Sequence, residues 1–173
     1  MHRPPDPHIK ANPSALACPS GTTASRSGDL TGLGALEDIF GVHLGLAHAA
    51  MAQGFKREVG ALRVTPKQVA LMWLADQTPG IAQIEVARLL RVDRATILGI
   101  TNNLVQRGLV TRGAAREDGP SDARRIGLHL SSAGVEVLHG ARAAIAVHEA
   151  RLLERLTPEE IEQALVIFRK LYL

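Results

Sequence analysis

The stretch that decides the fold is residues 82–109, AQIEVARLLRVDRATILGITNNLVQRGL. Its apolar residues recur at helical spacing in two runs, which predicts a short helix over 82–90 and a second helix over 94–107. Only residues 91–93 separate the two runs. Two short helices joined by so tight a turn form a helix-turn-helix.

Residues at the helix ends support this interpretation. Asp93 is a favourable N-cap for the second helix, and Val92 can pack against Ile97 as a hydrophobic staple that fixes the entry angle. Gly108 follows the last helical turn at the position where a left-handed residue commonly ends a helix. Leu109 supplies the apolar contact that accompanies such an ending.

The second helix has one face suited to the core and another suited to recognition. We expect Ile97, Ile100 and Leu104 to face the core. The outward residues would then be Arg94, Thr96, Leu98, Thr101 and Asn102. Recognition in the DNA major groove needs donors and acceptors on one exposed helical face, and a leucine can contact a thymine methyl group. The pattern therefore predicts a DNA recognition helix.

A β-hairpin is predicted after the second helix. Strand-like runs at 109–112 and 125–130 flank a polar loop over 113–124 that contains Gly and Pro. A helix-turn-helix followed by a hairpin is a winged helix, whose hairpin reaches a neighbouring minor groove. Narrow minor grooves attract arginine side chains. The candidates here are Arg116, Arg124 and Arg125.

Long helical patterns flank the winged helix. Apolar spacing predicts one continuous amphipathic helix over 33–62, and a capping box at Thr65 and Gln68 begins another helix that ends near Asp76. The expected buried side of that helix is Val69, Met72 and Trp73. Toward the C-terminus, Ser131 and Thr157 are expected to cap two further helices.

These patterns predict a mainly α-helical chain in four segments. They are a flexible Pro/Ser/Gly-rich tail over 1–28, an N-terminal dimerisation helix over 29–62, a winged helix over 63–130 and C-terminal dimerisation helices over 131–173. The apolar stripes of the long helices could be ordinary core. However, helices weakened by glycine need more burial than one winged helix offers, which favours a homodimer.

Composition narrows the class of protein. The chain has 173 residues, a formal charge of +3 and 46% hydrophobic residues, as in ordinary globular proteins. Residues 88–125 contain eight Lys/Arg and four Asp/Glu, a local balance of +4, which suits a nucleic-acid-facing segment or simply a solvated surface. The single cysteine, and the lack of a long apolar run or of a secretory signal pattern, favour the cytoplasm and no membrane association.

The sequence from about Leu33 to Leu171 resembles the MarR family of bacterial transcription regulators, most closely over 87–97 and 104–110. Asp122-Ala123-Arg124 is similar to the Asp-x-Arg signature of that family's wing. The resemblance implies a homodimer, joined by its first and last helices, that binds a pseudo-palindromic double-stranded operator, most often as a repressor. It also implies that Arg94, Thr96 and Asn102 face bases, that Arg124 enters the minor groove and that Asp122 orients the wing.

MarR-like regulators commonly respond to small aromatic anions, so the resemblance implies an effector site near the first helices. We expect an aromatic acid, a phenol or a related thioester as the effector. His43 could donate a hydrogen bond to it, and Arg63 could pair with its acid group. The other candidate residues are Ala47, Met51, Phe55, Met72 and Trp73, each of which could equally be plain core.

Two alternative functions remain open. Cys18 would serve a thiol-based redox-sensing repressor if a partner lowered its pKa. Gly99 stands where many family members carry arginine, which favours a dimeric protein-interaction module whose winged helix no longer recognises DNA. The histidines lack the spacing of a helical metal site, and no catalytic triad or phosphate loop is present, so we expect no metal, no cofactor and no enzyme.

Overall fold

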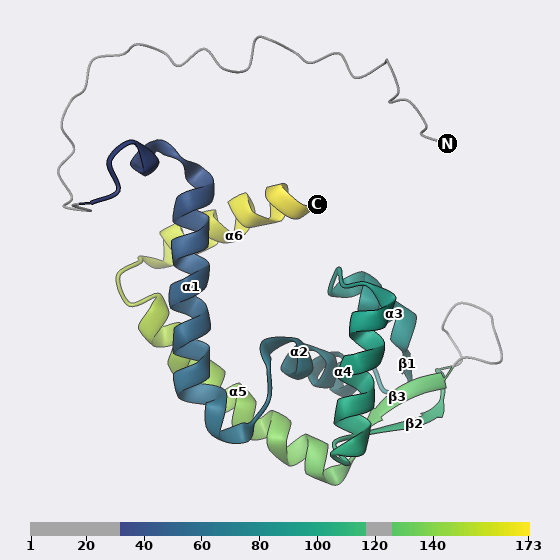
Figure 1. Ribbon diagram of the computed structural model, residues 1–173. Coiled ribbons are helices and arrows are strands. Elements are labelled where there is room, and N and C mark those ends of the chain that lie inside the picture. The colour runs from purple at the N-terminus through teal and green to yellow at the C-terminus, as the bar shows by residue number, and fades with distance from the viewer. Residues whose placement is uncertain (1–31, 117–125) are drawn as a thin grey trace, which may run out of the picture. The chain divides into compact units, whose positions relative to one another are not determined.

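The computed structural model describes residues 32–116 and 126–173. The chain divides into two compact units, residues 1–39 and 40–173. Of the first unit, the described part contains a 3-10 helix, η1 (Gly34–Asp38). The second unit holds all the α-helices and strands described below (Figure 1).

The prediction of one continuous helix over 33–62 is wrong. After η1, Ile39 has extended torsions of φ −96° and ψ 104°, and only then does α1 (Phe40–Val59) begin. A second 3-10 helix, η2 (Gly60–Leu62), follows and ends at Arg63, which is left-handed at φ 53°. Apolar spacing continues through these breaks, so the pattern alone could not locate them.

The helix-turn-helix is confirmed in position and in its capping. Its helices are α3 (Gln83–Leu89) and α4 (Arg94–Gln106), and they follow α2 (Pro66–Gln77). Gly108 has φ +68°, its N–H donates to the Val105 carbonyl and the Leu109 N–H donates to the Leu104 carbonyl, both at 2.9 Å. These two bonds define a Schellman motif, as the glycine and leucine at this position predicted.

The wing is a three-stranded antiparallel sheet in the order β1-β3-β2. Strands β2 (Val110–Ala114) and β3 (Ile126–Leu130) match the predicted hairpin. Strand β1 (Ile81–Ala82) was not predicted, because a strand of two residues is too short to show an alternating apolar pattern. Gly127 pairs with Ala82. A Cβ at Gly127 would lie 2.5 Å from the Ala114 carbonyl oxygen, so the close approach of the backbone at this position requires glycine.

The last two helices are α5 (Ser132–Leu152) and α6 (Pro158–Tyr172), capped by Ser131 and Thr157 as predicted. Helix α1 packs along α5, and α5 also contacts α2 and β3 (Figure 1). One core therefore joins the winged helix to the α1–α5 pair. Its fully buried members include Leu71, Met72, Val86, Ile97, Leu104, Leu128 and Leu138.

Three residues depart from the predicted burial. Thr101, expected outside, is fully buried because its hydroxyl donates to the Ile97 carbonyl at 2.8 Å and so needs no water. Trp73, expected inside, is only half-buried. The alternation within residues 125–130 predicts that Ile126 shares a face with Leu128 and Leu130, but Ile126 is 57% exposed.

Candidate functional site

The outward face of α4 is exposed along its length. Arg94, Leu98 and Asn102 lie on it as predicted, and Leu98 is 46% exposed. Ala95 and Gly99 complete this face, which places small side chains between the polar groups. Apart from the adjacent residues and the backbone of α4 itself, no described atom lies within 4 Å of where a Cβ on Gly99 would be, so the centre of the helix can approach another surface closely.

Asn102 is joined to the wing. The Arg112 guanidinium of β2 donates to the Asn102 side-chain oxygen at 2.5 Å. Since arginine only donates, the pair directs the Asn102 amide group so that its own N–H groups remain for another partner. A helix side chain and a strand side chain therefore share one donor-rich surface.

Thr96 is half-buried, and its polar groups are hydrogen-bonded to Asp93, the N-cap residue of α4. Its hydroxyl donates to Asp93 at 2.5 Å and its backbone N–H donates to the other oxygen of that carboxylate at 2.8 Å. The hydroxyl hydrogen bond is the main cause of the lowered pKa of Asp93. Thr96 can offer DNA only the lone pairs of its hydroxyl, because the proton already has an acceptor.

Arg116 lies at the base of the wing. Its guanidinium donates to the Glu85 carboxylate at 2.9 Å, and its backbone N–H donates to the Gly80 carbonyl at 3.2 Å. Glu85 in turn accepts the Ala82 N–H at the start of α3. Asp122, Arg124 and Arg125, the other wing candidates, lie outside the described residues, as does Cys18.

An apolar pocket of about 400 Å³ lies between α1, α2 and α5. Three predicted effector residues, Met51, Phe55 and Trp73, line it. Its other lining residues are His48, Ala52, Pro66, Val69, Ala70, Ile145, His148 and Glu149. The Arg142 guanidinium lies 4.5 Å from the centre of the Trp73 ring and donates to Asp76 at 2.7 Å, which holds the indole in place.

The other four predicted effector residues do not line this pocket. Met72 is fully buried in the core. Arg63 is exposed, and its carbonyl accepts a hydrogen bond from Arg107. His43 and Ala47 lie nearer the start of α1 than the pocket does.

His148 is a polar group of the pocket that the sequence interpretation missed. It is only 3% exposed, and its Nε2 has no hydrogen-bond partner among the described residues. Its ring packs so tightly on Gly54 of α1 that a Cβ there would lie 2.5 Å from the ring. A signal was present in the sequence, because His148 continues at helical spacing the apolar stripe of Leu138, Ala141 and Ile145.

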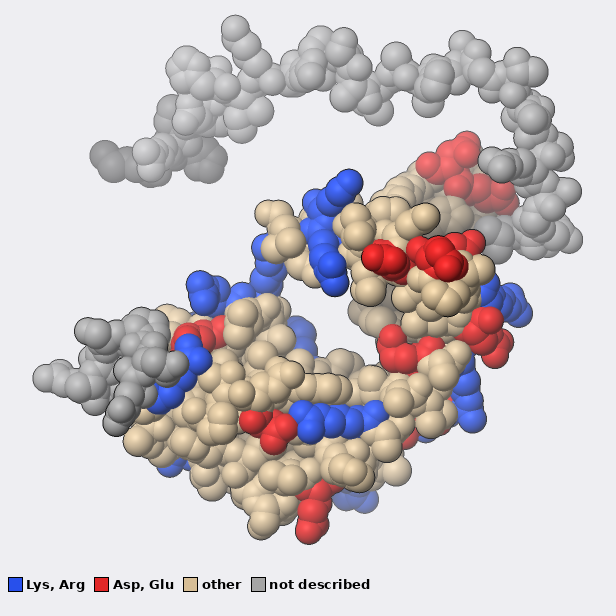
Figure 2. Space-filling view, turned by 180° about the vertical axis from the view of Figure 1, so that it is seen from behind, with Lys and Arg blue, Asp and Glu red and all other residues tan. Residues whose placement is uncertain are grey.

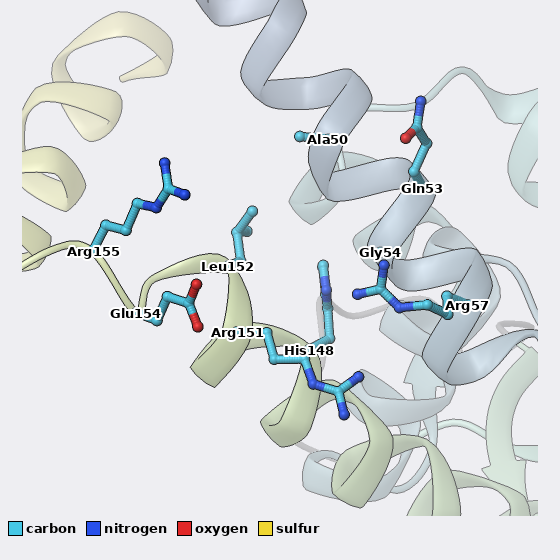
Figure 3. Close-up of a pocket in the computed structure, with 9 residues that line it drawn as sticks. All are labelled: Ala50, Gln53, Gly54, Arg57, His148, Arg151, Leu152, Glu154 and Arg155. Atoms are coloured by element: carbon cyan, nitrogen blue, oxygen red, sulfur yellow. The ribbon is translucent and has the colours of Figure 1, made fainter.

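A second pocket, of about 430 Å³, lies beside α1 and the end of α5 (Figure 3). Its charged residues are Arg57, Arg151, Arg155 and Glu154, and His148 also lines it. On the face shown in Figure 2, basic and acidic groups are scattered over a surface that is mostly neither. Among the described residues, no group of three or more His, Cys, Asp or Glu side chains is placed to hold a metal, and no helix is long and apolar enough to cross a membrane.

Side-chain hydrogen bonds connect the apolar pocket to α4. Gln68 of α2 donates to the Asn103 side chain of α4 at 2.8 Å, while its own oxygen accepts the Thr65 N–H at 2.8 Å. Arg107, just after α4, donates to the Arg63 carbonyl at 2.8 Å. Helix α2 therefore both forms one wall of the pocket and is hydrogen-bonded to α4.

Comparisons with known proteins agree with this architecture. The family description "MarR family" matches residues 64–126, which span the helix-turn-helix and most of the wing. A proposed transcriptional regulatory protein for the hcr operon of Thauera aromatica is 27% identical over 140 residues, which cover 80% of this chain and 82% of that protein.

Solved structures show the same fold. A probable transcriptional regulator from Pseudomonas aeruginosa is 32% identical with a TM-score of 0.69, covering 79% of this chain and 98% of that one. The transcriptional repressor CouR bound to a 23-mer DNA duplex is 29% identical with a TM-score of 0.72, covering 80% and 96%. CouR bound to p-coumaroyl-CoA is 28% identical with a TM-score of 0.70, covering 80% and 94%. This chain therefore belongs to the MarR family and is a winged-helix transcriptional regulator, not an enzyme.

Proposed function

We propose that the protein is a homodimeric repressor that binds a pseudo-palindromic operator and releases it when an aromatic acid, a phenol or a related CoA thioester binds. The observation that carries the proposal is the apolar pocket between α1, α2 and α5, whose α2 wall is hydrogen-bonded to α4. The similar repressor CouR has been solved both with DNA and with p-coumaroyl-CoA, which supports the same pairing of ligands here.

In the proposed complex α4 lies in the major groove. Arg94 would contact bases or phosphates, Leu98 a thymine methyl group, and the Asn102–Arg112 pair an acceptor on a base edge or phosphate. Thr96 would act as an acceptor only. The wing arginines, Arg124 and Arg125 above all, keep their predicted role in the minor groove.

The effector would place its aromatic ring against Trp73 and Phe55 in the pocket. His148 replaces His43 as the proposed hydrogen-bonding partner, because His148 lines the pocket and its Nε2 lacks a partner among the described residues. A phenol, carboxylate or thioester carbonyl could satisfy that nitrogen, depending on its tautomer. The pocket volume of about 400 Å³ is within the range of small-molecule sites.

Release of DNA would follow from a shift of α2. An effector changes the DNA affinity only if it binds one arrangement of the winged helix better than the other. A ring inserted beside Val69 and Trp73 would press on α2, and the Gln68–Asn103 bond would carry that displacement to α4. Two recognition helices about 34–36 Å apart in a dimer would then lose their match to successive major grooves.

The test is fluorescence anisotropy of the full chain on the DNA upstream of its own gene, with excess unrelated DNA, between about 50 and 200 mM salt. We expect tight, salt-sensitive, competitor-resistant binding that p-coumarate, 4-hydroxybenzoate or their CoA thioesters weaken. His148→Leu should raise the effector dissociation constant without changing the DNA affinity, whereas His43→Leu should change neither.

Asn103→Ala provides a separate test of the connection between the sites. It removes the acceptor for Gln68 but leaves the Thr65 capping box intact, so effector binding should persist while the effector-induced loss of DNA affinity shrinks. DNA binding no better than to unrelated sequence, across fragments covering the neighbouring promoters, would contradict the repressor function and favour the interaction module.

A further inference from the structure

Three arginines line the second pocket, one from α1 and two from the C-terminal end of α5 and the segment after it. Arg57 comes from α1, Arg151 from the last turn of α5, and Arg155 from the connection between α5 and α6 (Figure 3). The pocket has a volume of about 430 Å³. Packing of α1 on α5 therefore brings Arg57 and Arg151 close enough to share one carboxylate, that of Glu58.

One carboxylate already orients two of these arginines. Glu58 accepts hydrogen bonds from Arg57, at 2.9 Å, and from Arg151, both through its Oε1 atom. The hydrogen bond from Arg57 is the main cause of the lowered pKa of Glu58, so this carboxylate stays ionised at neutral pH. Counting Glu58 and the lining residue Glu154 against the three arginines leaves one positive charge uncompensated.

His148 forms the inner wall of the same pocket and supplies the second observation. Its Nε2 is buried and has no hydrogen-bond partner among the described residues, although buried polar groups in folded proteins nearly always have one. Tight packing on Gly54 prevents the ring from moving toward α1 to find another partner. A bound acceptor would satisfy this nitrogen as an N–H donor.

We propose that this arginine pocket, defined by Arg57, Arg151, Arg155 and His148, binds a phosphate group. Planar guanidinium groups match the geometry of phosphate oxygens and bind them through paired hydrogen bonds. The half-exposed side chains of Arg57 and Arg151 keep the pocket open to a dissolved anion. The source is either inorganic phosphate or the phosphate of a small metabolite, for which the pocket has room.

This site goes beyond the proposed effector function and does not depend on it. The residues of α1 that line the arginine pocket are Ala50, Gln53, Gly54 and Arg57, and none of them lines the apolar pocket. At 100° per residue the two sets lie on opposite sides of α1, and His148 alone is shared between the pockets. A phosphate in the arginine pocket and an effector in the apolar pocket would therefore compete only for the Nε2 atom of His148.

The test is isothermal titration calorimetry of the full chain, in its native oligomeric state, with inorganic phosphate and separately with coenzyme A. We expect Arg155→Gln and Arg151→Gln each to weaken binding about tenfold or more, as expected for losing a charge-assisted hydrogen bond. Arg169→Gln, an exposed arginine of α6 outside the pocket, is the matched control and should leave binding unchanged. The ring resonances of His148 should shift when phosphate is added to the wild type.

The outcomes separate the two sources. Binding of phosphate but not of coenzyme A identifies a free-anion site, and tighter binding of coenzyme A that phosphate displaces identifies a phosphorylated metabolite. Thermal melts show whether each variant is folded. No binding of either probe up to about 10 mM, or equal binding by folded Arg155→Gln and wild type, overturns the proposal.

Discussion

Gly54 and His148 meet where α1 packs on α5, and each restricts the other. A buried imidazole on α5 leaves no space for a side chain at residue 54, although glycine in a helix interior costs about 1 kcal/mol relative to alanine. The contact places the imidazole between the two pockets. Gly54 is therefore required, despite its low helix propensity, by the histidine that we propose as a ligand-binding group.

Replacing Gly54 with Ala is expected to destabilise the protein despite the better helix propensity. The new Cβ would lie 2.5 Å from the His148 ring, and overpacking of this kind costs about 1–3 kcal/mol. Gly99→Ala is the control: among the described residues nothing outside the local backbone of α4 lies within 4 Å of its Cβ position, so the free energy of unfolding should rise by about 0.5–1 kcal/mol. Chemical denaturation measures both, and a gain in stability for Gly54→Ala would show that the ring moves freely.

Helix α4 depends on its first residues as much as on its buried face. Asp93 accepts both the N–H and the hydroxyl of Thr96, so the N-cap fixes the start of the helix that carries Arg94. Its C-terminal half is held by Gln68 and Arg107. An element oriented at both ends by side chains can present its exposed face in a defined direction.

The stability supplied by Asp93 should depend on pH. Its pKa in the fold lies below the ordinary value of 3.8, so the ionised cap stabilises the fold above that value and is lost as the pH falls through the lowered pKa. Thermal melts should show Asp93→Ala less stable than wild type at pH 7, with a smaller difference at acidic pH. Asp93→Asn, a good cap that does not titrate, should remove most of the pH dependence at this site. An equal deficit for Asp93→Ala across this range would contradict the role of charge.

The chain taken by itself leaves much apolar surface uncovered. No residue of α6 is buried, and in the first part of α1 the apolar residues Phe40, Leu44 and Leu46 are exposed. The exposed apolar residues of α6 are Leu165, Val166, Ile167, Phe168, Leu171 and Tyr172. A monomer rarely keeps so large an apolar face in water, which supports the proposed homodimer.

Charge introduced into this face should dissociate the dimer. Phe168→Glu on α6 would have to bury a carboxylate in an apolar contact, so we expect light scattering after size exclusion to shift from the dimer mass toward the monomer mass. Operator affinity should fall with it, because two half-sites are then bound by separate chains. Lys170→Glu, a neighbouring exposed polar position, is the control and should stay dimeric. A dimer that survives Phe168→Glu with unchanged mass would place the interface elsewhere.

Local signals in the sequence determined the parts of this protein that follow from short-range chemistry. Thr65, Asp93, Ser131 and Thr157 cap helices as predicted, and Gly108 ends the recognition helix, because capping depends on residues within one turn. The order of these elements predicted the winged helix. The same patterns placed Arg94, Leu98 and Asn102 on the exposed face of α4.

Tertiary structure decided what depends on contacts between distant segments. The sequence favoured His43 for the effector site, yet the fold brings His148 to the pocket because α5 returns along α1. Thr101 is buried because its hydroxyl bonds within its own helix, which residue type alone does not reveal. The arginine pocket is lined by residues almost a hundred positions apart in the sequence. Neither apolar periodicity nor composition can predict that these residues lie together, because their proximity depends on the packing of α1 on α5.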